Sequence, residues 1–192
     1  MQANILQTAL AYADRGFSVI PIRPDKKPFI KWESYQTTKA SPEEIKSWFT
    51  KWPNAMIGIC TGEISGLLVV DCDNEEAYQR IQELLPEGFL TAIAKTPRGY
   101  HLYFIYPAGQ QIGNAAGIIP GVDVRGQGGY IIGPPSVNAE GKAYAWLPGL
   151  SIDDVALAPL PCELTRALFN NSTNKYYRER VDSFVDSADF FT

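Results

Sequence analysis

Apolar residues recur along the chain at two spacings, one typical of amphipathic helices and the other typical of strands. A helix start is clearest at residues 41–44, where Ser41 precedes Pro42 and Glu44 stands at the third helical position. Strands are expected where short apolar or alternating runs lie between glycine and proline residues. We predict helices over 4–15, 41–51, 74–85 and 163–169, a polar loop over 110–120, and strands over 17–22, 55–60, 67–73, 90–95, 100–106, 121–125 and 143–147.

The strand predicted over 67–73 joins four apolar residues to the acids Asp71 and Asp73. Alternation along a strand places both acids on one face, roughly 7 Å apart at Cα. Two like charges there repel each other, and a hard divalent cation such as Mg²⁺ or Mn²⁺ would relieve the repulsion. A structural alternative is that Asp73 caps the helix that follows, with Glu76 completing a capping box.

Further polar candidates lie on the two strands that follow in the sequence. His101 is the single histidine of the chain, and Arg98 lies in the adjoining turn, which suggests an anion site. Asp123 and Arg125 share one face of the strand predicted over 121–125, while valines occupy the other face. A half-exposed edge strand showing its polar side would give the same pattern. The glycines of 126–129 permit close approach of the backbone to a ligand, although neither a Walker pattern nor a dinucleotide-binding fingerprint is present.

A loop near the start of the chain carries Lys27, Lys31 and Trp32. Lysines beside an aromatic ring can follow a phosphate backbone while the ring stacks on a base. The alternative is a solvated loop that is anchored by one tryptophan.

Composition narrows the class of protein. The 192 residues, 45% of them hydrophobic, suffice for one well-cored domain. No apolar run is long enough to span a bilayer, so no membrane partner is expected. The three scattered cysteines fit neither a disulfide framework nor a zinc site, which favours a reducing cytoplasm. A net charge of −4 argues against a general nucleic-acid coat protein but allows local basic patches.

The polar run at 170–174 has the composition of a linker. We therefore expect a catalytic domain over 1–169, followed by a linker or tail over 170–192 that leads to a further C-terminal region.

Three segments taken together, 68–73, 96–104 and 121–130, resemble in their order the three motifs of the archaeo-eukaryotic primase superfamily. They are most similar to the bifunctional primase/polymerase (prim-pol) domain of plasmid and phage replication proteins. The segments 134–136 and 11–21 are also similar, so the resemblance covers about residues 4–169. It implies an α+β fold with a catalytic sheet like that of the RNA-recognition motif (RRM-like) beside a smaller α/β unit. Three cysteines and one histidine cannot build a zinc-binding stem.

The resemblance also implies a site and its substrates. Asp71, Asp73 and Asp123 would hold two Mg²⁺ or Mn²⁺ ions, and with His101 they form the expected catalytic set. The expected nucleotide ligands are His101, Arg98, Arg125, Gly128, Gly129, Ser136 and Thr96, and Lys27, Lys31 and Trp32 are candidates for contact with the DNA template. The implied partners are a DNA template and primer, dNTP or NTP, and a helicase region in a longer protein, in the replication of a mobile element or phage.

Two other functions would use the same residues. A metal-dependent nuclease or phosphotransferase could use the three acids to activate water. A non-catalytic nucleotide-binding or origin-binding module could keep the fold without turnover.

Overall fold

In residues 4–169, which the computed structural model describes, nine strands form two sheets whose neighbouring strands all pair antiparallel. The smaller sheet has the order β1-β2-β8, with β1 (Ser18–Ile22), β2 (Met56–Cys60) and β8 (Tyr130–Gly133). The larger sheet has the order β6-β7-β3-β5-β4-β9, with β3 (Leu67–Cys72), β4 (Ile93–Lys95), β5 (Tyr100–Ile105), β6 (Ala115–Ile119), β7 (Val122–Arg125) and β9 (Ala145–Trp146). The predicted α+β class is confirmed.

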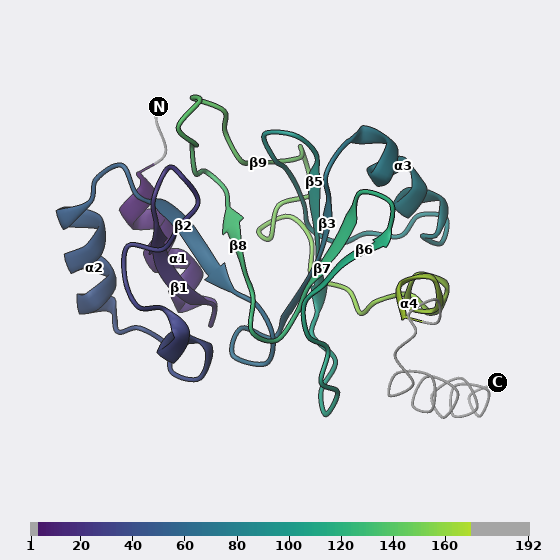
Figure 1. The fold of residues 1–192 in the computed structure, drawn as a ribbon, viewed down its shortest axis with the longest axis horizontal. Coiled ribbons are helices and arrows are strands. Elements are labelled where there is room, and N and C mark those ends of the chain that lie inside the picture. Colours follow the sequence, from purple (N-terminus) through teal and green to yellow (C-terminus); the bar gives the residue numbers. More distant parts are fainter. Residues whose placement is uncertain (1–3, 170–192) are drawn as a thin grey trace.

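The helices divide between the two sheets (Figure 1). Beside the smaller sheet lie α1 (Ile5–Asp14), α2 (Pro42–Lys51) and the short 3₁₀ helix η1 (Glu33–Gln36). Beside the larger sheet lie α3 (Glu75–Glu83) and α4 (Cys162–Phe169). The capping box predicted at the start of α2 is present, because the Glu44 N–H donates to Ser41 Oγ and the Ser41 N–H donates to Glu44 Oε2.

Strand β3 is the centre of the larger sheet and is buried on both faces, as predicted. On one face Leu68, Val70 and Cys72 pack in a cluster with residues of α3 and α4. On the other face Leu67 and Val69 pack in a cluster with residues of α1 and α2. The next residue on that second face is Asp71, so the apolar seam between the two sheets ends at a carboxylate.

Two elements differ from prediction. Residues 115–119 form β6 rather than part of a polar loop, and β7 therefore lies between β3 and β6 instead of at an edge. The half-exposed edge strand is thus the wrong interpretation of Asp123 and Arg125. Strand β8 was not predicted.

No described helix combines the length and apolar character needed to cross a bilayer. The predicted linker or tail at 170–192 lies outside the described residues.

Candidate active site

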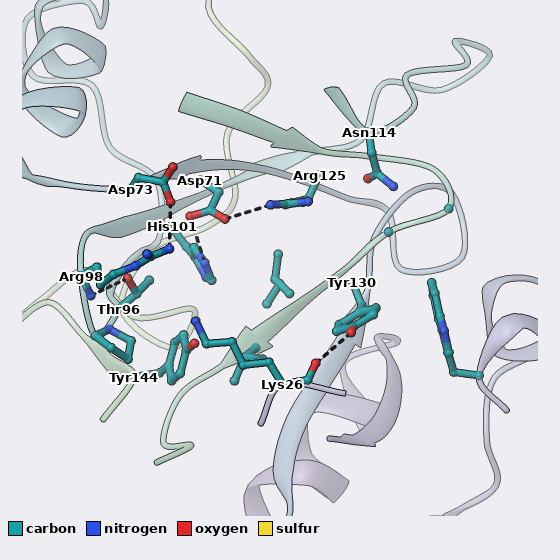
Figure 2. Close-up of a pocket in the computed structure, with 16 residues that line it drawn as sticks. Lys26, Asp71, Asp73, Thr96, Arg98, His101, Asn114, Arg125, Tyr130 and Tyr144 are labelled. Carbon is teal, nitrogen blue, oxygen red and sulfur yellow. Dashed lines mark hydrogen bonds and ion pairs between the residues drawn. The ribbon is translucent and has the colours of Figure 1, made fainter. Parts of the chain in front are cut away.

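A cavity of about 370 Å³ is lined by segments of both sheets and by the loops beside them. The predicted site residues that line this cavity are Trp32, Asp71, Asp73, Thr96, Arg98, His101, Arg125, Gly128 and Gly129. Figure 2 shows the acidic and basic side chains of this set gathered around one space. Residues that lie up to 97 positions apart in the sequence, from Trp32 to Gly129, therefore share one site.

The central row of the site crosses three strands. Asp71 on β3 is paired with His101 on β5 and with Asp123 on β7. Directly opposite residues of neighbouring strands project from the same face of a sheet. His101 Nε2 lies 3.4 Å from Asp71 Oδ1. Asp71, His101 and Asp123 therefore lie side by side on one face of the larger sheet.

Arg125 connects the two acids of this row. Its Nη2 atom lies 2.8 Å from Asp123 Oδ2 and 3.6 Å from Asp71 Oδ2. The other Asp123 oxygen accepts a hydrogen bond of 2.9 Å from the Gly117 N–H on β6. Asp123 itself is not among the residues that line the cavity, whereas Arg125 lines it.

Asp73 follows β3 directly and forms a second acid–arginine pair. Its backbone N–H donates to the Gly121 carbonyl at 2.8 Å, and its Oδ1 lies 3.4 Å from Arg98 Nη2. The cap of α3 is Asn74, whose Oδ1 accepts from the Ala77 N–H at 2.9 Å. The interpretation of Asp73 as the helix cap is therefore wrong, because the next residue, Asn74, is the cap. The Asp73 residue lines the cavity instead.

The turn at 96–99 places Arg98 beside Asp73. Thr96 Oγ1 accepts from the Gly99 N–H at 3.0 Å and from the Arg98 N–H at 3.4 Å. A Cβ atom at Gly99 would overlap the Cys72 carbonyl oxygen, so only glycine lets the turn pack on the end of β3. The Thr96 hydroxyl thus accepts hydrogen bonds within the turn, although the residue also lines the cavity.

The charge of Asp71 is set by opposing effects. Burial raises its pKa, but the contacts with His101 and Arg125 outweigh burial and hold the pKa below its ordinary value. The carboxylate is therefore ionised at neutral pH. On the other side of the imidazole, His101 Nδ1 is buried and has no hydrogen-bond partner among residues 4–169.

The three carboxylates are suitable ligands for a hard cation, but they do not converge on a single point in this structure. Asp71, Asp73 and Asp123 offer carboxylate oxygens, which Mg²⁺ and Mn²⁺ prefer. Within residues 4–169 no three His, Cys, Asp or Glu side chains lie close enough to hold a metal ion together. Arg98 and Arg125 form ion pairs with these acids.

Ser136 departs from its predicted place at the nucleotide. It is buried, its Oγ accepts a 2.8 Å hydrogen bond from the Ile57 N–H, and it does not line the cavity. Its hydroxyl attaches the segment after β8 to the start of β2. We therefore remove Ser136 from the candidate site.

The glycines and the N-terminal loop follow the prediction in part. Gly128 has φ +83°, which favours glycine, and a Cβ at Gly129 would displace the Asn114 side chain at the cavity wall. Trp32 lines the cavity and packs edge-to-face on Tyr130, with ring centroids 4.9 Å apart. Lys27 and Lys31 are exposed and do not line the cavity.

Four polar lining residues were missed by sequence reasoning: Lys26, Asn114, Tyr130 and Tyr144. Lys26 had a signal, because it adjoins the candidate Lys27 in the same basic loop. Tyr130 also had one, because it ends the motif over 121–130. Asn114 and Tyr144 had none, because long-range folding brings them to the cavity.

The chain matches the model of a known protein family. The family model described as bifunctional DNA primase/polymerase, N-terminal (Prim-Pol), matches residues 9–163. This match contains every residue of the central row and both arginines. No curated protein matches the chain. The chain belongs to the Prim-Pol family of bifunctional DNA primase/polymerase N-terminal domains.

Proposed function

We propose that the domain catalyses template-dependent nucleotidyl transfer, adding dNTP or NTP to a nucleic-acid 3′-hydroxyl as a DNA primase, a DNA polymerase or both. Membership of the family implies nucleotidyltransferase activity in general. The observation that carries the finer proposal is the row of His101, Asp71 and Asp123 across three strands, with Arg98 and Arg125 beside it. We assign this activity to the replication of a mobile element or phage.

Asp71, Asp73 and Asp123 are the residues that would hold two divalent cations, Mg²⁺ or Mn²⁺. Bound there, the cations would make a 3′-hydroxyl more acidic and neutralise charge on a triphosphate. Two observations support the assignment: all three donors are oxygens, and the pKa of Asp71 is held low enough to keep it ionised.

Arg98 and Arg125 would bind the phosphate oxygens of the incoming nucleotide. Both guanidinium groups line the cavity and are accessible, with 71% and 36% of their side chains exposed. Charge-assisted hydrogen bonds from guanidinium to phosphate are among the strongest in proteins. The Gly128–Gly129 backbone lies at the same wall and offers close approach without side-chain obstruction. His101, which is fixed through Nε2 to Asp71, would orient that carboxylate within the site.

The remaining details of the proposal concern the sheet and the DNA. Along the chain the elements follow the order β3, α3, β4, β5 and β7, and in the sheet the strands have the order β7-β3-β5-β4. This arrangement supports an RRM-like catalytic sheet. Template DNA would enter beside Trp32 and Lys26, which line the cavity from one loop. Lys27 and Lys31 are exposed on that same loop and would contact the DNA backbone.

Incubation with a primed template, labelled dNTPs and Mn²⁺ tests the proposal. Extension supports nucleotidyl transfer, degradation favours the nuclease alternative, and no change favours a non-catalytic module. Asp71→Asn should abolish extension. The control variant Glu87→Gln changes an exposed carboxylate in the loop after α3. It should extend the primer as well as the unchanged protein does.

A further inference from the structure

Tyr144 is a wall residue of the cavity whose ring is almost completely buried. Only 4% of the residue is exposed, and the ring packs in an apolar cluster with Ile22, Met56 and Ile132 from the smaller sheet. Its backbone N–H donates to the Ser136 carbonyl at 2.8 Å. The ring is thus held firmly by groups that belong to the fold.

The Tyr144 hydroxyl, in contrast, has no partner within the described residues. Two other tyrosines use theirs: buried Tyr12 donates to the Pro134 carbonyl, and half-buried Tyr130, at the same cavity, donates to the Lys26 carbonyl. The side-chain atoms of the described residues that are sealed without a partner are His101 Nδ1 and the Tyr103 hydroxyl. The Tyr144 hydroxyl is not one of them, so it opens to the cavity that the residue lines.

The surroundings of this hydroxyl are charged. The Tyr144 and His101 rings lie 6.0 Å apart, and the charges of Asp71 and Arg98 are near enough to act on the Tyr144 hydroxyl. Burial raises the pKa of Tyr144 to about 12, with the Asp71 charge adding to the rise and Arg98 opposing it. The phenol therefore keeps its proton at neutral pH and can serve as a donor near Arg98, a proposed phosphate ligand.

We propose that the Tyr144 hydroxyl donates a hydrogen bond to a phosphate oxygen of the bound nucleoside triphosphate, an inference that rests on the proposed function. A neutral donor adds affinity for the anion without adding a cation that would compete with metal ions for the acids. The phosphate is favoured over the base because Tyr144 lies near Arg98, which is proposed to bind phosphate oxygens. The rings that can stack on a base, Trp32 and Tyr130, pack on each other elsewhere in the cavity.

Tyr144→Phe removes the hydroxyl and keeps the ring. We expect the affinity for inorganic tripolyphosphate and for dATP, measured by calorimetry with Mg²⁺ present, to fall by about tenfold or more in both cases. The melting temperature should stay unchanged, because no protein hydrogen bond is lost. Tyr12→Phe is the matched control: it removes the hydrogen bond to the Pro134 carbonyl, so it should lower the melting temperature and leave tripolyphosphate affinity unchanged.

The outcomes separate this inference from the proposed function. Unchanged affinity of Tyr144→Phe for both ligands overturns the inference, and primer extension by the unchanged protein would then still support the function. Weaker binding of dATP alone indicates a sugar or base contact and overturns the phosphate assignment. Weaker binding of both ligands without primer extension by the unchanged protein supports the inference and contradicts the function. If the unchanged protein binds neither ligand, both are overturned.

Discussion

Asp71 on β3 and Asp123 on β7 lie directly opposite each other, and the Arg125 guanidinium contacts both carboxylates. Like charges opposite each other across two strands are destabilising. Arg125 offsets this repulsion while no cation is bound. A metal ion at the same carboxylates would take over that role and release the guanidinium for a phosphate, so metal binding and phosphate binding should be coupled.

Arg125→Ala should reveal this coupling in the stability of the protein. Without the guanidinium the paired acids lose their counter-charge, so the metal-free variant should be less stable by about 1 kcal/mol. Added Mg²⁺ should then raise its melting temperature more than that of the unchanged protein, because binding to the folded state stabilises it. Thermal unfolding with and without Mg²⁺ measures both effects.

Arg80→Ala is the control for Arg125, because Arg80 forms an exposed pair with Glu76 on α3, at 3.6 Å. It should not change the response to Mg²⁺. An equal Mg²⁺ shift in Arg125→Ala and in the unchanged protein would contradict the coupling.

Two adjacent residues separate catalysis from helix capping. Asp73→Ala should abolish primer extension and change stability by less than about 0.5 kcal/mol, because its pair with exposed Arg98 is long and solvated. Asn74→Ala should cost about 1 kcal/mol, because it removes the cap of α3, and should keep extension. Urea unfolding and the extension assay on both variants give the comparison. The reverse pattern would restore the capping interpretation of Asp73.

Much of the fold follows from local sequence signals. The capping residues of α2 and the apolar run of β3 are read within a few neighbouring residues, and both are present in the structure. Strand β6 was missed because Ala115, Ala116 and Gly117 have low strand propensity. Its Ala115, Ile118 and Ile119 pack against the core cluster beside α3 and α4, and this long-range packing is not visible in local propensity.

The site was predictable only as far as alternation along single strands allows. Alternation gives the face of Asp71, His101 and Asp123, but not the register that aligns them, because register depends on pairing between distant segments. Tyr144 reaches the cavity through packing against the smaller sheet, which no local pattern encodes. Ser136 was assigned from its motif position, whereas its hydroxyl is used by the Ile57 N–H.

The low pKa of Asp71 predicts a dependence of stability on acid pH. A carboxyl group whose folded-state pKa is depressed contributes stability above its unfolded pKa, and this contribution is lost as pH falls through the folded value. The unchanged protein should therefore lose stability below about pH 4. Asp71→Asn should lose less over the same range, as measured by urea unfolding between about pH 5 and pH 3. Glu87→Gln, an exposed control, should follow the unchanged protein, and an identical profile for Asp71→Asn would contradict the assignment.

Gly99 should be required for the geometry of the Arg98 turn. An alanine Cβ there would meet the Cys72 carbonyl and the Asn74 backbone nitrogen, neither of which can move without disturbing the end of β3. We expect Gly99→Ala to cost roughly 1–3 kcal/mol of stability, as overpacked sites do. Primer extension should fall as well, because Arg98 and Asp73 would be displaced together. Gly113→Ala is the matched control, since a Cβ at that position meets nothing within 4 Å, and it should keep both stability and extension. If Gly99→Ala proved as stable and active as Gly113→Ala, the turn would not depend on its close approach to β3, and Arg98 would owe its position to another contact.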